Sequence, residues 1–302
     1  MVDITNKTNT LRIATAQAIV KVSKQETIDA INNDTVPKGN VFAMSKAAGL
    51  LGVKKTPELL PDCHPMPIEF TGIEYEINEL KITVKVTVKT IYKTGAEVEA
   101  MHGASLVALN MYDMLKPIDK GIEIQNIKLL SKKGGKSDFR DKYRKDLMAS
   151  VIVCSDTISA GKKEDRAGKE IIKKLEESSV KISTYSIIPD EPTEIKKALL
   201  AEVEKGSNIV IFTGGTGLSK RDITPETILP LLEREIPGVA EAIRNHGQDR
   251  TPYSMLSRSV AGSIGDTLVL ALPGSTNGAK ESMEAVFPSI LHIFKVFEGG
   301  KH

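Results

Sequence analysis

The chain has 302 residues, enough for about two domains. Its 41 basic and 39 acidic side chains nearly cancel, giving a formal net charge of +2, so we expect neither nucleic acid nor a membrane surface as a partner. The sequence shows no membrane-spanning apolar run and no secretory signal, and its two distant cysteines form no disulfide framework, so we expect a cytoplasmic protein.

The first half of the chain mixes helical and strand patterns. Helices are predicted over 25–33 and 41–52, and a third over 97–116 from apolar residues at helical spacing. Between them, residues 73–92 alternate apolar and polar side chains on either side of a short turn, which predicts two antiparallel strands buried on one face. We therefore predict an α+β domain, an antiparallel sheet with helices on one face, in a ferredoxin-like arrangement.

A charged segment separates the two halves. Residues 131–146 contain glycines and many charges but almost no aliphatic side chains, which is typical of a domain boundary. Because Lys132 is expected to belong to the first domain's site, we place the boundary near residue 147. The predicted domains are 1–146 and 147–302.

The second half follows a different pattern. Short apolar runs alternate with helical patterns, which predicts parallel strands joined by helices, in a doubly wound α/β domain with a mostly parallel sheet. The expected strands are 149–155, 180–188, 208–213 and 267–274, and the expected helices are 165–177, 193–205 and 279–298.

A glycine-rich loop follows one of these strands. The segment TGGTGLSKRDITPE (213–226) begins at the carboxyl end of an apolar strand, where open parallel sheets bind ligands. Gly214, Gly215 and Gly217 allow backbone amides to approach an anion closely, and Thr216 adds a hydroxyl donor. The spacing fits neither a P-loop nor a dinucleotide-binding motif. GGTG alone could equally be an ordinary glycine turn, but the whole string is far more specific.

That string resembles the signature of the molybdopterin adenylyltransferase family, which includes MogA and MoaB of bacteria and the G domain of gephyrin. The resemblance spans roughly 149–298 and includes the blocks SDTIS, EDRAG, PDE, EIPGVAEAIR, MLSRSVAG and LPGS. It implies transfer of AMP from ATP, as co-substrate, to the terminal phosphate of molybdopterin with Mg²⁺. The family's acidic positions fall on Asp190 and Asp222, implied as catalytic residues and metal ligands. Ser275 is a candidate phosphate ligand, although a helix N-cap explains it equally well.

The first half carries scattered polar clusters. Lys38 precedes a predicted helix, His64 lies between two prolines, and Glu97 is near the start of another helix. Asp113 and Lys116 are three residues apart and share one helix face, where a surface salt bridge is the simpler interpretation. Taken alone, these clusters define no particular chemistry.

In order and spacing, these clusters resemble the cyclic pyranopterin monophosphate synthase (MoaC) family over almost all of 1–139. The blocks are KGNVF, LLPDCHP, KTGAEVEAMHGAS, MYDMLK and LLSKKGGKSDF. The resemblance implies conversion of a cyclised triphosphate derived from dihydro-GTP into cyclic pyranopterin monophosphate, with release of pyrophosphate.

The same resemblance assigns roles to individual residues. Asp113 matches the catalytic acid or base, and Lys38, Lys116 and Lys132 match essential cations. Several cations in one pocket suit a triphosphate, and a lysine of lowered pKa can also move protons. Val98 replaces the methionine often found in the family, and SKKGGKSDF lacks a glycine usually present before Asp-Phe. The implied substrate-binding residues are Arg12, Asp62, Cys63, His64, Glu97, Val98 and Glu99, with Gly214, Gly215, Thr216, Gly217 and Ser275 in the second half.

Three functions compete. The chain is a bifunctional enzyme, a lyase plus a transferase; or an active synthase whose second domain only binds molybdopterin; or a scaffold. The intact glycine and acidic motifs favour the first. The five histidines show no zinc-binding spacing. We expect pterin and nucleotide partners and a homo-trimer or homo-hexamer, because both families form threefold assemblies, with the first domain's sites at subunit boundaries.

Overall fold

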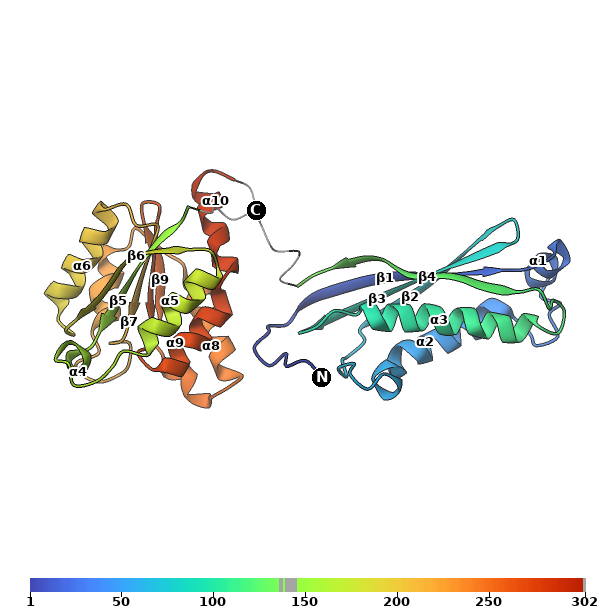
Figure 1. The fold of residues 1–302 in the computed structure, drawn as a ribbon, viewed down its shortest axis with the longest axis horizontal. Coiled ribbons are helices and arrows are strands. Elements are labelled where there is room, and N and C mark those ends of the chain that lie inside the picture. The colour runs from blue at the N-terminus through green and yellow to red at the C-terminus, as the bar shows by residue number, and fades with distance from the viewer. Residues whose placement is uncertain (136–137, 139–145, 301–302) are drawn as a thin grey trace. The chain divides into compact units, whose positions relative to one another are not determined.

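The structure, a computed structural model, describes residues 1–135, 138 and 146–300. The chain divides into two compact units, Met1–Phe139 and Arg140–His302 (Figure 1). The domain boundary expected near 147 remains a prediction, because residues 139–145 lie outside the described part. No helix within that part is long and apolar enough to cross a membrane.

The first unit is a four-stranded antiparallel sheet covered on one face by helices α2 and α3 (Figure 1). Its strand order β2-β3-β1-β4 and its βαββαβ succession are the ferredoxin-like arrangement that was expected. Its elements are β1 (Thr10–Lys21), α1 (Gln25–Asn32), α2 (Val41–Leu59), β2 (Phe70–Asn78), β3 (Lys81–Tyr92), α3 (Glu97–Leu115) and β4 (Glu123–Lys133).

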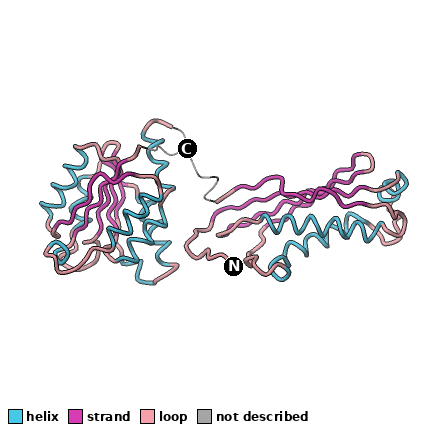
Figure 2. Tube along the Cα trace, in the orientation of Figure 1, coloured by secondary structure: helices cyan, strands magenta, loops and turns pink. Residues whose placement is uncertain are grey.

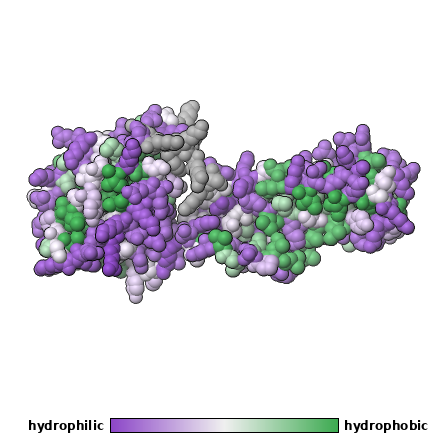
Figure 3. All heavy atoms as spheres, in the orientation of Figure 1, coloured by the Kyte–Doolittle hydropathy of each residue, from purple (hydrophilic) through white to green (hydrophobic). Residues whose placement is uncertain are grey.

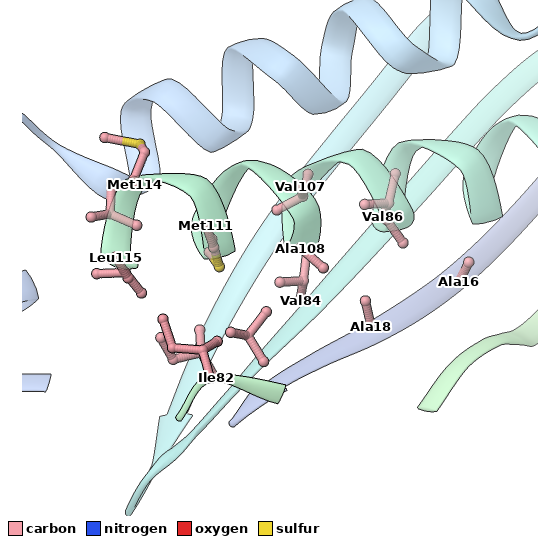
Figure 4. Close-up of a cluster of buried hydrophobic side chains, with 14 of the residues drawn as sticks. Ala16, Ala18, Ile82, Val84, Val86, Val107, Ala108, Met111, Met114 and Leu115 are labelled. Atoms are coloured by element: carbon pink, nitrogen blue, oxygen red, sulfur yellow. The ribbon is translucent and has the colours of Figure 1, made fainter. Parts of the chain in front are cut away.

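The core of this unit lies between the sheet and α3. Val84 and Val86 of β3 and Val107 of α3 are fully buried (Figure 4). Strand β1 contributes small side chains, Ala16 and Ala18, to the same cluster. The alternation of apolar and polar residues over 73–92 predicted β2 and β3 correctly. It did not predict β1, whose inward positions are mostly alanines with weak strand preference, nor β4, an edge strand with mostly exposed polar side chains.

The second unit is a six-stranded sheet with strand order β6-β5-β7-β10-β9-β8, lying between layers of helices (Figure 2). The first four strands are parallel, and β9 is antiparallel to both of its neighbours. The expected doubly wound, mostly parallel architecture is confirmed. The elements are β5 (Met148–Cys154), α4 (Asp156–Ser159), α5 (Ala167–Glu177), β6 (Lys181–Ile188), α6 (Pro192–Glu204), β7 (Ile209–Thr213), α7 (Thr224–Ile228), η1 (Leu229–Leu231), β8 (Arg234–Glu235), α8 (Pro237–Gln248), η2 (Pro252–Leu256), β9 (Val260–Ile264), β10 (Thr267–Leu272), α9 (Thr276–Val286), η3 (Ser289–His292) and α10 (Ile293–Phe297).

Two separate cores explain the continuous apolar runs of the central strands. Ile211 of β7 packs into the cluster beneath α5 and α9, whereas its neighbour Phe212 packs into the opposite cluster with α6. Strand β5 divides in the same way between Val151 and Ile152. A strand buried on both faces needs apolar residues at every position, so its sequence does not alternate.

One predicted element of this unit is wrong. A single helix was expected over 279–298, but α9 ends at Val286 and is followed by η3 and α10. Pro288, immediately before η3, lacks the amide that a continuous helix needs there. The apolar spacing continues through this interruption, so periodicity alone did not reveal it.

Candidate active sites

The first candidate site lies at the carboxyl edge of the second unit's sheet. Strands β5 and β7 are neighbours, and the chain leaves them in opposite directions: from β5 to β6 on one side, and from β7 to β8 at the far edge on the other. The loops after them touch: a Cβ on Gly214 would lie 2.1 Å from the carbonyl oxygen of Cys154. Such a switch point is where doubly wound sheets bind ligands.

The glycine-rich loop contacts both predicted acidic residues. Gly214 and Gly215 have φ angles of +107° and +63°, which side chains rarely adopt. A Cβ on Gly215 would lie 3.2 Å from Oδ1 of Asp190, and one on Gly217 would lie 2.8 Å from Oδ2 of Asp222. The structure thus brings the glycine loop and both of these carboxylates together.

The two carboxylates differ electrostatically. Asp190 exchanges hydrogen bonds with Asp156: each backbone amide donates to the other's carboxylate at 3.1 Å. Oδ1 of Asp190 is buried and has no hydrogen-bond partner among the described residues. Burial raises the pKa of Asp190, and the nearby carboxylates of Asp156 and Asp222 raise it further.

Asp222 is held in its ionised form. Burial acts to raise its pKa, but hydrogen bonds from Ser219 and from the Gly217 amide, together with the charge of Arg258, lower it overall. The Ser219 amide donates to Oδ2 of Asp222 at 2.8 Å. The crevice therefore pairs a readily ionised carboxylate with one that is harder to ionise.

A pocket of about 600 Å³ adjoins this crevice. Thr216 and Gly217 line one side, residues of η2 line another, and Gly274 and Ser275 line a third. The Ser275 hydroxyl also accepts a hydrogen bond from the Gly278 amide at 3.2 Å, which caps α9. Both interpretations of Ser275 are thus compatible with its position.

Gly214→Ala is expected to destabilise the second unit. The φ of +107° and the 2.1 Å approach to Cys154 leave no room for a methyl group, so the free energy of unfolding should fall by at least about 2 kcal/mol. Gly206→Ala is the matched control. Its φ is +80° with nothing within 4 Å of a Cβ, so only the backbone cost of about 1 kcal/mol is expected. Urea unfolding of both variants measures the difference, and equal losses would contradict the close approach.

In the first unit, Asp113 lies between two lysines. Lys38 Nζ is 2.6 Å from Oδ2 of Asp113, and Lys116 Nζ is 2.8 Å from Oδ1. Hydrogen bonds from Lys116 and Lys38 lower the pKa of Asp113 to about 2. Asp113 lies in the last turn of α3, Lys116 follows it, and Lys38 precedes α2. Together they form a charged surface group of two cations and one anion.

A second group surrounds the first turn of α3. Lys132 on β4 forms an ion pair with Glu97 at 3.1 Å, and the Cys63 thiol donates to Oε1 of Glu99 at 3.1 Å. Glu99 is 1% exposed, and burial raises its pKa. Burial and the Glu99 carboxylate raise the pKa of Cys63 to about 12.

The remaining predicted residues lie at this same end of the unit. His64 Nε2 is 2.8 Å from the Val2 carbonyl oxygen, and both His64 and Asp62 line a cavity of about 570 Å³. Arg12 donates to the carbonyl oxygen of Tyr92 at 3.3 Å, and Val98 is exposed at the start of α3. None of these residues contacts the Asp113 group.

The two groups are separated by the length of α3. Glu97 and Asp113 are sixteen residues apart on one helix, which corresponds to about 24 Å. Within a single chain, the cations of the two groups therefore do not meet in one pocket. Helical spacing placed Asp113 beside Lys116 correctly. That Lys132 would pair with Glu97, at the other end of the same helix, was not predictable from local spacing.

Two family models match the chain in tandem: residues 1–135 match the MoaC family, and residues 150–292 match a probable molybdopterin binding domain. A molybdenum cofactor biosynthesis bifunctional protein of Chlorobaculum tepidum is 38% identical over 302 residues, covering 100% of this chain and 96% of that protein. The protein of the same description from Synechococcus elongatus is 35% identical, covering 100% and 98%. The chain belongs to this bifunctional family.

Membership of this family assigns the chain to molybdenum cofactor biosynthesis. The MoaC-family unit alone is also 46% identical to a cyclic pyranopterin monophosphate synthase of Aquifex aeolicus, over 46% of this chain and 54% of that protein. The resemblance to two fused families, which the sequence motifs indicated, is thus confirmed.

Some residues at the molybdopterin-binding-domain site were not predicted. Asp156 pairs with Asp190 and also with Arg221, and Arg258 contacts the glycine loop from outside it. The hydroxyl of Thr224 is buried next to Gly215. Asp156 and Arg258 lie in the blocks SDTIS and MLSRSVAG, which were quoted only for their resemblance to the adenylyltransferase family. Arg221 and Thr224 lie in the glycine-rich string itself. For Asp156 and Arg258, the resemblance of these blocks was therefore the available signal.

Cys63 in the MoaC-family unit is expected to resist alkylation. With a pKa of about 12, its thiolate is scarce at pH 8, and labelling should be on the order of 10²-fold slower than for a free cysteine peptide. Because the pH stays below this pKa, the rate should rise about tenfold per pH unit between pH 7 and 10.

Glu99→Gln removes the negative charge beside the thiol and should accelerate the labelling of Cys63. Peptide mass spectrometry of iodoacetamide-treated protein reads Cys63 separately from Cys154. Labelling of the unmodified protein as fast as the free peptide would contradict the buried pairing.

Proposed function

We propose that the MoaC-family unit converts a cyclised triphosphate derived from dihydro-GTP into cyclic pyranopterin monophosphate with release of pyrophosphate. The observation that carries this proposal is the placement of ionised Asp113 between Lys38 and Lys116. Held ionised, this carboxylate positions the two ammonium groups, whose charges can offset those of the phosphates. The relative from Aquifex aeolicus, described as a cyclic pyranopterin monophosphate synthase, supports the same activity.

We further propose that each complete site of this unit is shared between copies. Asp113 with its lysines would be supplied by one copy, and Arg12, His64 and Glu99 by another, because about 24 Å separates the groups within one chain. An apolar surface accompanies them: Figure 3 shows hydrophobic side chains gathered over the helices of this unit, where Leu51, Leu59 and Leu109 are more than half exposed. Apolar area of this kind marks an interface.

A homo-trimer or homo-hexamer is therefore expected in solution. Light scattering coupled to size-exclusion chromatography should give a mass three or six times 32.8 kDa. Leu51→Glu, on the exposed surface of α2, should shift the assembly to a smaller species and reduce pyrophosphate release with it. A monomer with full synthase activity would contradict the shared site.

For the second unit we propose transfer of AMP from ATP to molybdopterin. The observation that carries this proposal is the meeting of the glycine loop, Asp190 and Asp222 at the switch point. Backbone amides of the loop would bind phosphate oxygens, and the adjoining pocket of about 600 Å³ is of a size that holds a small organic ligand.

The donor set suits Mg²⁺, which binds proteins through one or two carboxylates and completes its shell with water and substrate phosphates. Asp190 and Asp222 would hold it; Oδ1 of Asp190 is a buried oxygen without a partner among the described residues. The metal would neutralise phosphate charge during transfer. Ionised Asp222 would anchor the cation, while Asp190, held by Asp156, would orient it.

One assay tests this activity. The full chain is incubated with ATP, MgCl₂ and molybdopterin, and the adenylylated product and pyrophosphate are measured by chromatography. We expect product to form only when all three are present. Binding of molybdopterin without product would instead identify a binding-only second unit.

A further inference from the structure

Arg258 connects two walls of the pocket in the second unit. It lies between η2, whose residues line the pocket, and β9 in the sheet. Its side chain extends to the glycine loop and to the turn that carries Asp222.

The guanidinium makes three contacts with the opposite wall. Nε donates to the Gly217 carbonyl oxygen at 2.8 Å, Nη2 donates to the Asp222 carbonyl oxygen at 2.6 Å, and Nη1 forms an ion pair with Glu226. In addition, the Arg258 amide donates to the Thr216 carbonyl oxygen at 3.3 Å. Two acceptors are main-chain oxygens on either side of the Asp222 turn, so these bonds constrain the backbone that carries the carboxylate.

Planarity makes this arrangement specific to arginine. The guanidinium presents its N–H groups in a fixed fork, so simultaneous bonds to Gly217, Asp222 and Glu226 fix their relative positions. A lysine could reach one of the three acceptors but could not hold all of them at once. Arg221, by contrast, pairs only with side-chain carboxylates, those of Asp156 and Glu191.

We propose that Arg258 is a positioning residue for adenylyl transfer: it fixes Asp222 and the glycine loop relative to the η2 wall of the pocket. The inference rests on the proposed transfer activity. All three guanidinium nitrogens already donate to acceptors of the protein. We therefore assign Arg258 a geometric contribution, and a displacement of about 1 Å at a reacting centre can cost on the order of 10² in rate.

The test compares Arg258→Met, Arg258→Lys and the control Arg234→Met, an exposed arginine on β8. We expect Arg258→Met to lower kcat for adenylyl transfer on the order of 10²-fold, with KM for molybdopterin changed less than about threefold. Arg258→Lys should recover about a tenth of the wild-type rate, and the control should match wild type. Thermal unfolding shows whether Arg258→Met is folded. If it is not, the effects on kcat and KM are compared for Arg258→Lys instead.

Amide hydrogen exchange supplies a second measurement. Arg258→Met should speed exchange in peptides covering 214–222 while leaving β10 unchanged. Unchanged exchange, an unchanged kcat, or a loss confined to KM would each overturn the positioning role. Absence of product from the wild-type chain would instead refute the proposed transfer activity, and so the two failures are distinguishable.

Discussion

Lys38→Ala is expected to abolish pyrophosphate release by the MoaC-family unit, by at least about 10³-fold, while adenylyl transfer in the same chain continues. Lys38 Nζ lies 2.6 Å from Asp113 and is one of the two cations that hold this carboxylate ionised. Its removal takes away a phosphate-binding charge and a proton-handling group together. Pyrophosphate release from the triphosphate substrate and adenylyl transfer are measured on one preparation.

Lys24→Ala provides the control for this variant. Lys24 is an exposed lysine of the same unit, at the start of α1, and belongs to neither of the two charged groups described above. It should retain full activity. If Lys38→Ala lost both activities at once, misfolding or coupling between the units would be indicated, and if it retained pyrophosphate release the assignment of Lys38 would be wrong.

Asp222→Asn is expected to lower adenylyl transfer by about 10²- to 10³-fold. The substitution preserves the size of the side chain but removes the charge that the surrounding hydrogen bonds stabilise. The Mg²⁺ concentration needed for half-maximal rate should rise, whereas molybdopterin should still bind, because its pocket is lined by other residues. Initial rates across a Mg²⁺ titration measure both effects.

Asp266→Asn is the matched control, because Asp266 is exposed in the turn between β9 and β10, at the opposite edge of the sheet. We expect it to match wild type at every Mg²⁺ concentration. An Asp222→Asn variant with unchanged rate and unchanged Mg²⁺ dependence would remove Asp222 from the proposed metal site.

The fold was predictable where burial on one or both faces of an element produced a periodic pattern. Val84 and Val86 alternate with polar residues because one face of β3 is open, and the central strands β5 and β7 are apolar throughout because both faces are covered. The pattern fails where small or charged residues form strands, as in β1 and β4. It also fails where one residue interrupts a helix, as Pro288 does.

The candidate sites were predictable to different degrees. The place of the glycine loop followed from its position at the carboxyl end of a parallel strand. Asp190 and Asp222 were singled out by the family resemblance. Arg258 precedes an antiparallel strand that was not predicted, so nothing in its local pattern indicated that its side chain would reach back to Gly217. In the MoaC-family unit, the charged pairs join residues that are far apart in the sequence, such as Lys38 with Asp113 and Glu97 with Lys132. Local sequence spacing could not predict which of these residues lie close together.

Helix α3 is a spacer of fixed length between the two charged groups of the MoaC-family unit. It carries Glu97 at its first residue and Asp113 in its last turn. Inserting one residue into α3 would move one end about 1.5 Å along the axis and turn it by about 100° relative to the other. If the site is shared between copies as proposed, such a change would misdirect the groups at the two ends of α3, even if the helix and its core were kept. Insertions should therefore be tolerated in the loops of this unit but not within α3.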